Sequence, residues 1–165
     1  MSILKSIYDY SNSNPNCCYT DILGRNNDCS FAWNDGVSIA IIEEKENQNN
    51  IMLPLEYKQF LTYSNGAKIF VEDNGNAGYE LLSLDNIISE TKLMRKCGYP
   101  IEENELIFMR MLYSGNFMLF DYNNRIITYC DAEYDKEEWV QMHTNFDDFI
   151  LRLFWANGNP FWEWY

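Results

Sequence analysis

The chain has 165 residues, of which 47% are hydrophobic and 16% aromatic, and this content suits one ordinary domain with a packed core and excludes a disordered chain. Twenty-five Asp and Glu residues against twelve Lys and Arg give a formal net charge of −13. Such a charge repels phosphate backbones and anionic lipid, so we expect no direct binding of nucleic acid or membranes.

The first half of the chain is predicted to be mainly helical. A short helix in residues 3–10 is followed by the helix-breaking stretch 11–15, and we expect residues 1–34 to form a peripheral helix and loop. Residues 35–165 are expected to form the main domain. A second helix is predicted to start within residues 34–36, with Val37, Ala40 and Ile41 facing inward. A third helix begins at Pro54, and Asn65-Gly66 supplies its left-handed end.

The second half is predicted to be mainly strands. Runs at 67–71 and 79–83 form a hairpin, and Asp85 caps a fourth helix that reaches about residue 96. Three strands at 106–112, 117–121 and 126–130 are separated by short turns that favour an antiparallel meander, and residues 139–142 add an edge strand. Asn145 caps a last helix with apolar residues at helical spacing. The predicted class is therefore α+β, a single domain with a mostly antiparallel sheet flanked by helices.

The sequence lacks the patterns of a membrane span, a signal peptide and a cysteine metal site, and this bears on where the protein acts and on its cofactors. No window approaches the ~20 apolar residues of a membrane span, and residues 1–10 lack the apolar run of a signal peptide. The five cysteines include no Cys-x-x-Cys pair. We expect a cytoplasmic protein with reduced thiols and no cofactor, in which Cys130 lies in the core while Cys17 and Cys18 lie in a polar loop and could oxidise incidentally.

The segment LPLEYKQFL, residues 53–61, closes with Ser64-Asn65-Gly66-Ala67 and resembles the hallmark of the SUKH superfamily of SMI/KNR-like domains. That pattern has a Leu-Pro opening, an aromatic and leucine helix and an Asn-Gly end. Further similarity lies in residues 79–87, in the strand 117–121 and in the last helix, so that residues 35–155 resemble one such domain. Many relatives have Asn-Gly-Gly where this chain has Asn65-Gly66-Ala67, which still leaves the left-handed turn available.

The resemblance implies a function in protein binding. The superfamily includes yeast cell-wall-synthesis regulators and herpesviral proteins, and its small bacterial members resemble immunity proteins for polymorphic toxins, often nucleases. We therefore expect no enzyme, but a protein that neutralises a cognate toxin, a basic nuclease domain, by occluding its active site. The alternative is a regulatory or scaffold SUKH domain that binds endogenous proteins. Either function is compatible with a homodimer.

Catalytic and metal-binding patterns are sparse. His143 is the only histidine, and a single imidazole beside a predicted helix start more often has a structural role than a catalytic one. The adjacent acids Asp147 and Asp148 suit the first turn of a helix, where they oppose the positive end of its dipole. We therefore predict no catalytic residue and no metal site.

Acidic residues concentrate after the third strand of the meander, around Tyr134. This segment is either a solvated loop or a contact patch in which acids steer a basic partner and an aromatic side chain anchors it. A second acidic loop, residues 72–74, follows the first hairpin strand. The aromatic tail 161–165 is either packed or exposed as a further contact. The partner-binding candidates are Glu72, Asp73, Asp131, Glu133, Tyr134 and Asp135.

Overall fold

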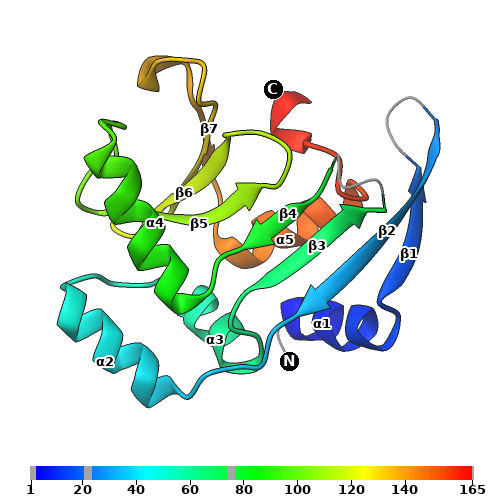
Figure 1. Cartoon of the computed structure of the whole chain (residues 1–165), viewed down its shortest axis with the longest axis horizontal. Helices are drawn as coiled ribbons and strands as arrows, with labels where there is room; N and C mark the ends of the chain where they lie inside the picture. The colour runs from blue at the N-terminus through cyan, green and yellow to red at the C-terminus, as the bar shows by residue number, and fades with distance from the viewer. Residues whose placement is uncertain (1–2, 21–23, 74–76, 165) are drawn as a thin grey trace.

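The computed structural model of the chain describes residues 3–20, 24–73 and 77–164. Within these residues, eight strands form one antiparallel sheet in which each strand pairs with the next along the chain (Figure 1). The arrangement confirms the predicted α+β class, and the predicted strands from residue 67 onward correspond to β3–β8. The strands are β1 Asn16–Thr20, β2 Asn26–Trp33, β3 Ala67–Glu72, β4 Tyr79–Leu81, β5 Glu105–Met111, β6 Phe117–Asp121, β7 Ile126–Cys130 and β8 Val140–His143.

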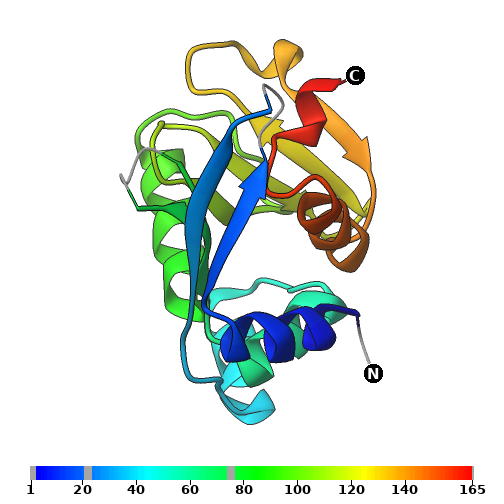
Figure 2. The same cartoon turned by 90° about the vertical axis from the view of Figure 1, so that its right-hand side faces the viewer.

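Helices cover both faces of this sheet. α1, α3 and α5 contact one another, and α5 covers the face opposite to α4, which packs on β5 (Figure 2). Because β5 is covered on both faces, six of its seven residues are buried. The helices are α1 Ile3–Ser13, α2 Ile39–Asn49, α3 Leu55–Tyr63, α4 Leu84–Lys96 and α5 Phe146–Trp155, with short 3-10 helices η1 Lys136–Glu138 and η2 Phe161–Trp164.

Tyr57 of α3 lies at the centre of the core and is fully buried. Its hydroxyl donates to the carbonyl oxygen of Leu82 at 2.7 Å and lies 3.2 Å from that of Phe108. Burial raises the pKa of Tyr57 well above its usual value, so the phenol is neutral. The hydroxyl therefore joins α3 to the end of β4 and to β5. Four aromatic rings surround it, those of Phe60, Phe108, Phe120 and Phe146.

Two predicted helix starts are wrong by a few residues. α2 begins at Ile39 rather than within residues 34–36, and α4 is capped by Ser83 rather than by Asp85. In each helix a serine with extended backbone precedes the first turn, and its hydroxyl accepts a main-chain N–H. Asp85 already lies inside the first turn, where its carboxylate pairs with Lys45 at 2.7 Å.

Of the residues predicted to face inward around α2, Val37 packs against the core, but Ala40 and Ile41 do not. Ile42 is fully buried, whereas Ala40 and Ile41 are exposed. α2 contacts only α3 and α4 among the elements with substantial packing. A helix with so narrow a contact buries a single stripe, so neighbouring apolar residues point toward water.

The described part of residues 1–34 contains two strands in addition to the predicted helix. β1 and β2 extend the sheet, and Leu4, Cys29 and Phe31 are buried in the core. Cys17, expected in a polar loop together with Cys18, lies in β1 like its neighbour. In the sequence, the signal for β2 is the alternation of Cys29, Phe31 and Trp33 with the small residues Ser30 and Ala32. The division at residue 34 thus falls between β2 and α2.

The predicted left-handed turn after α3 is confirmed, since Gly66 has a φ of +90°. A Cβ atom there would lie 2.9 Å from the carbonyl oxygen of Leu81 and from the main-chain nitrogen of Ser83. Gly98 has a φ of +93° but no neighbour within 4 Å of such a Cβ. The two glycines therefore share a positive φ, but only at Gly66 would an added Cβ atom collide with the main chain.

We expect Gly66→Ala to lower the free energy of unfolding more than Gly98→Ala does. Backbone strain alone should cost about 1–2 kcal/mol in either variant. Displacement of the main chain around Gly66 should add about 1 kcal/mol or more. Urea unfolding of both variants measures the difference, and equal losses would show that the turn after α3 accommodates a side chain.

Candidate protein-interaction surface

Three hairpin connections lie at one end of the sheet. Because consecutive strands run antiparallel, the β3–β4, β5–β6 and β7–β8 connections share an end and the intervening ones lie opposite. The register agrees, since Tyr79 pairs with Met111 and Phe117 pairs with Cys130. Both groups of partner-binding candidates fall at this end, beside η2 (Figure 1). We name this surface the acidic rim, comprising residues 72–73, 113–116, 131–139 and Glu163.

The β7–β8 connection is an ordered loop held by Trp139. This side chain is 7% exposed and packs edge-on against Phe117. Its indole N–H donates to the carbonyl oxygens of Asp131 and Tyr134 at 3.1 and 3.2 Å. The Asp131 carboxylate accepts the main-chain N–H of Glu133 at 3.0 Å. Trp139 and Asp131 therefore hold the loop in its conformation. The other acidic side chains of the loop project from it.

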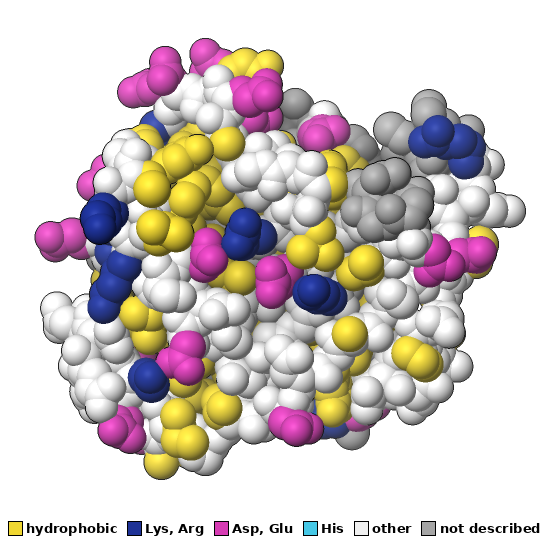
Figure 3. Space-filling view, viewed as in Figure 1, with side chains coloured by type: hydrophobic (Ala, Val, Ile, Leu, Met, Phe, Trp, Pro, Cys, Tyr) yellow, Lys and Arg dark blue, Asp and Glu magenta, His cyan; other side chains and the backbone are white. Residues whose placement is uncertain are grey.

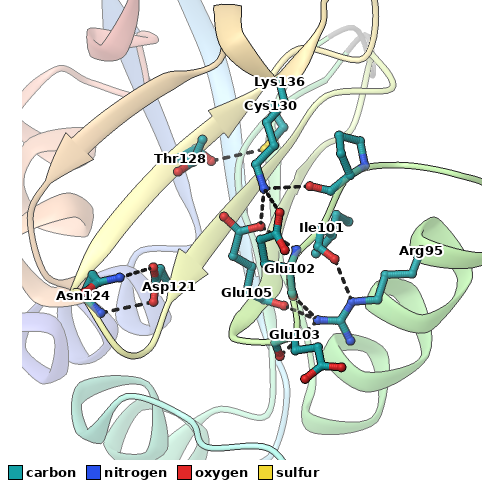
Figure 4. Close-up of polar contacts among 11 residues, drawn as sticks. Arg95, Ile101, Glu102, Glu103, Glu105, Asp121, Asn124, Thr128, Cys130 and Lys136 are labelled. Carbon is teal, nitrogen blue, oxygen red and sulfur yellow. Dashed lines mark hydrogen bonds and ion pairs between the residues drawn. The ribbon is translucent and has the colours of Figure 1, made fainter.

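Lys136 pins the same loop to the chain before β5 (Figure 4). Its ammonium group donates to the carbonyl oxygen of Pro100 at 2.8 Å and pairs with Glu102 and Glu105 at 3.1 Å each. Burial alone would lower the pKa of Lys136, but hydrogen bonds to Glu105 and Glu102 raise it above its usual value. The Glu105 carboxylate is buried, so Lys136 is the charge that makes its burial tolerable.

Arg95 of α4 ties down the other side of this segment. Its guanidinium donates to the carbonyl oxygens of residues 101, 102, 103 and 105 (Figure 4). The segment that receives Lys136 is thereby fixed to α4. A rigid support of this kind reduces the ordering that a loop undergoes on binding.

Asn116 joins the β5–β6 and β7–β8 connections. Its side-chain oxygen accepts the main-chain N–H of Ala132 at 3.0 Å, and its side-chain nitrogen donates to the Tyr129 hydroxyl at 2.6 Å. The Tyr129 hydroxyl lies 3.4 Å from the Asp131 carboxylate. The two connections therefore form one surface.

Three acidic residues of the rim lie near the two tyrosines Tyr113 and Tyr129. Burial first, and then the charges of Glu163 and Glu72, raise the pKa of Tyr113 above its usual value. Burial and the Asp131 charge raise the pKa of Tyr129 to about 12, with a further contribution from Glu163. Acids from β3, from the β7–β8 loop and from η2 thus act on neighbouring phenols. Glu72, Asp131 and Glu163 therefore lie close enough to act on the same pair of tyrosines.

The structure locates each predicted candidate on this rim. Glu133, Tyr134 and Asp135 are exposed, whereas Asp131 is half-buried. Glu72 is half-buried at the end of β3, and Asp73 next to it is exposed. Asn74, the third residue of that predicted loop, lies outside the described residues. Figure 3 shows acidic side chains along the edge over the β7–β8 loop, with hydrophobic surface next to them.

Two further rim residues, Tyr113 and Glu163, are not among the predicted partner-binding candidates, although Glu163 falls within the aromatic tail. Tyr113 is half-exposed in the β5–β6 connection, and Glu163 is exposed in η2. Neither lies in an acid-rich segment, so only the fold brings them to the others. Phe161 and Trp162 of the aromatic tail are buried, which confirms packing for these two, while Tyr165 lies outside the described residues.

A groove of 290 Å³ lies at the opposite end of the sheet. Leu55 and Met52 lie at the mouth of this groove, and their side chains are 65% and 61% exposed. The Leu-Pro opening of the hallmark segment therefore forms one of its walls. The other walls come from the β6–β7 turn and the start of α5. The lining includes residues 52–56, 58, 120–122, 125–127 and 144–146.

Within the described ranges, no group of three or more His, Cys, Asp or Glu side chains is placed to hold a metal ion. His143 is exposed on the edge strand β8. None of the described helices combines the length and the apolarity needed to cross a bilayer.

Comparison with known proteins gives matches over most of the chain. A sequence model of the SMI1 / KNR4 family (SUKH-1) matches residues 36–152. The uncharacterized protein YobM of Bacillus subtilis (strain 168) is 32% identical over 142 residues, covering 79% of this chain and 72% of YobM. The uncharacterized protein YnaB of the same organism is 24% identical over 140 residues, covering 82% and 89% of the two chains. The family match contains the hallmark segment and all six partner-binding candidates.

We expect Lys136→Met to lower the free energy of unfolding by roughly 1–3 kcal/mol, because the buried Glu105 carboxylate loses its charged partner. Combining it with Glu105→Gln should cost less than the sum of the single changes. Urea unfolding of the double-mutant cycle measures this coupling. Lys68→Met, at an exposed position of β3, serves as the control and should change stability by less than about 0.5 kcal/mol. Additive costs for Lys136 and Glu105 would contradict the proposed pairing.

Proposed function

The chain belongs to the SMI1 / KNR4 family (SUKH-1), and on this premise we propose that it is an immunity protein whose acidic rim binds a cognate toxin. The observation that carries the proposal is the gathering of exposed acids and tyrosines on one rigid edge of the sheet. Neutralisation requires no reaction by this chain, only coverage of the toxin's active site. We expect the protein to act in the cytoplasm.

The expected partner is a basic nuclease domain. An enzyme that binds nucleic acid presents a positive groove to the phosphate backbone. A negative surface with complementary charge is attracted to that groove and accelerates encounter. With a formal net charge of −13, the whole chain reinforces the field of the rim.

The rim also has the apolar contacts that a stable interface needs. Tyr134 is 57% exposed among the acids of the β7–β8 loop. It lines a shallow cleft together with Tyr99, Pro100 and Trp139. Aromatic side chains surrounded by polar ones are typical of interface hot spots. Because Trp139 and Lys136 already order this loop, little conformational entropy should be lost on binding.

A regulatory or scaffold function is the second candidate, and the groove at the opposite end of the sheet favours it. Exposed Leu55 and Met52 beside a concave surface suit an apolar peptide from an endogenous protein. This candidate uses the groove, whereas neutralisation of a basic toxin uses the rim. Variants of the two surfaces therefore separate the functions.

Glu133, Asp135 and Glu137 are each replaced by Lys in one triple variant. This variant should associate about tenfold or more slowly with the product of a neighbouring toxin gene at low ionic strength. The effect should shrink as salt screens the field. Asp131 is left intact because its carboxylate shapes the loop. Surface plasmon resonance across a salt series measures the rate, and co-expression with the toxin tests protection.

The matched control reverses three exposed acids near α2, far from the rim (Figure 1). Asp35→Lys, Glu43→Lys and Glu44→Lys change the net charge by the same amount. This control should keep most of the association rate. Equal slowing in both triple variants would show that net charge alone matters, and an unaffected rim variant that still protects would refute the proposed contact surface.

Leu55→Asp separates the second candidate from the first. It should leave toxin affinity within about twofold, because the groove and the rim lie at opposite ends of the sheet, and protection should persist. Leu93→Asp, at another exposed leucine on α4, controls for the added charge. Loss of a co-purified endogenous protein from Leu55→Asp alone, with no toxin bound by either variant, would favour the scaffold function instead.

A further inference from the structure

Cys17 and Cys29 lie directly opposite each other on the neighbouring strands β1 and β2. Side chains at directly opposite positions of an antiparallel ladder lie on the same face of the sheet, close to one another. Cys29 is buried, whereas Cys17 is half-buried and so reachable from solvent. The pair therefore combines two facing cysteines with a route by which a small reagent can arrive.

A solvent-connected cavity adjoins the pair. Three cysteines line it, Cys17, Cys18 and Cys29, together with Asn16, Asp28 and Asp73. Cys18 is exposed and lies opposite Asp28. Burial and the Asp28 carboxylate raise the pKa of Cys18, and burial raises the pKa of Cys29, so neither of these thiols is the one that attacks the oxidant first. Of the thiols in the cavity, Cys17 has both access and a neighbouring thiol that can complete a disulfide.

We propose that Cys17 and Cys29 are a redox-active pair that forms a reversible disulfide with a low-molecular-weight disulfide, such as oxidised glutathione, as the oxidant. The Cys17 thiol loses its proton and attacks one sulfur of the oxidant, which releases one glutathione thiol and leaves a mixed disulfide. The Cys29 thiol then loses its proton and attacks the Cys17 sulfur, releasing the second glutathione thiol. Two protein thiols are oxidised by two electrons, and one glutathione disulfide is reduced to two thiols.

Strand geometry makes this bridge easy to break. The Phe31 N–H donates to the Pro15 carbonyl oxygen at 2.7 Å, so alternation along the ladder makes Cys17 and Cys29 a hydrogen-bonded pair. Such pairs have Cα atoms ~5.5 Å apart, within the range of disulfides, but the bridge needs Cβ atoms at ~3.8 Å. Drawing the strands together strains the bond, and strained disulfides are the readily reduced ones.

The test treats the reduced full chain with excess oxidised glutathione and measures its intact mass and tryptic peptides. Trypsin cleaves after Lys5, Arg25 and Lys45, so Cys17 and Cys29 fall in different peptides. We expect a mass lower by two hydrogen atoms and a disulfide that joins peptide 6–25 to peptide 26–45. Addition of reduced glutathione alone should reverse the link.

Variants assign the partners of the bond. Cys18→Ser and Cys97→Ser should keep the link, whereas Cys17→Ser should abolish it. Cys29 is buried, so Cys17→Ser carries the test if Cys29→Ser fails to fold. A link that survives Cys17→Ser, glutathione adducts without an internal bridge, or a bridge that reduced glutathione cannot break would each overturn the proposal. The result does not depend on the proposed toxin binding.

Discussion

The structure depends on the burial of one polar group, the Tyr57 hydroxyl. A phenol in an apolar core is costly unless its hydrogen bond is made, and here the main-chain carbonyls after β4 and within β5 accept it. The position of α3 is therefore fixed by a directional hydrogen bond as well as by apolar packing. The aromatic rings around Tyr57 come from α3, β5, β6 and α5, so these elements share one constraint.

The simple order of the sheet explains how distant residues form one surface. Each strand pairs with the next along the chain, so alternate connections gather at the same end. One end collects the acidic connections and η2, and the other collects the start of α3 and the β6–β7 turn. A domain built in this way has two chemically different ends, one negative and firmly held, the other concave and apolar. The proposed toxin contact and its alternative correspond to these two ends.

Rigidity at the acidic end comes from residues that do not themselves look like binding residues. In the sequence, Lys136 is a single basic residue within an acidic segment. In the structure, its ammonium group pairs with the buried carboxylate of Glu105. Trp139 follows the acidic run, yet its indole orders that run by two hydrogen bonds. Acids held in place by such contacts keep their field oriented toward a partner, which favours rapid and specific encounter.

The sequence by itself determined the strands from residue 67 onward, the last helix with its Asn145 cap, the left-handed turn at Gly66 and the acidic segment around Tyr134, because these depend on local periodicity and turn chemistry. It did not determine β1 and β2, the inward face of α2 or the rim residues Tyr113 and Glu163. Only the tertiary structure decided these, since an edge strand, a narrow helix contact and a surface built from separate connections acquire their meaning from neighbours remote in the chain. Side-chain pairing across such distances leaves no periodic trace in the residues that make it.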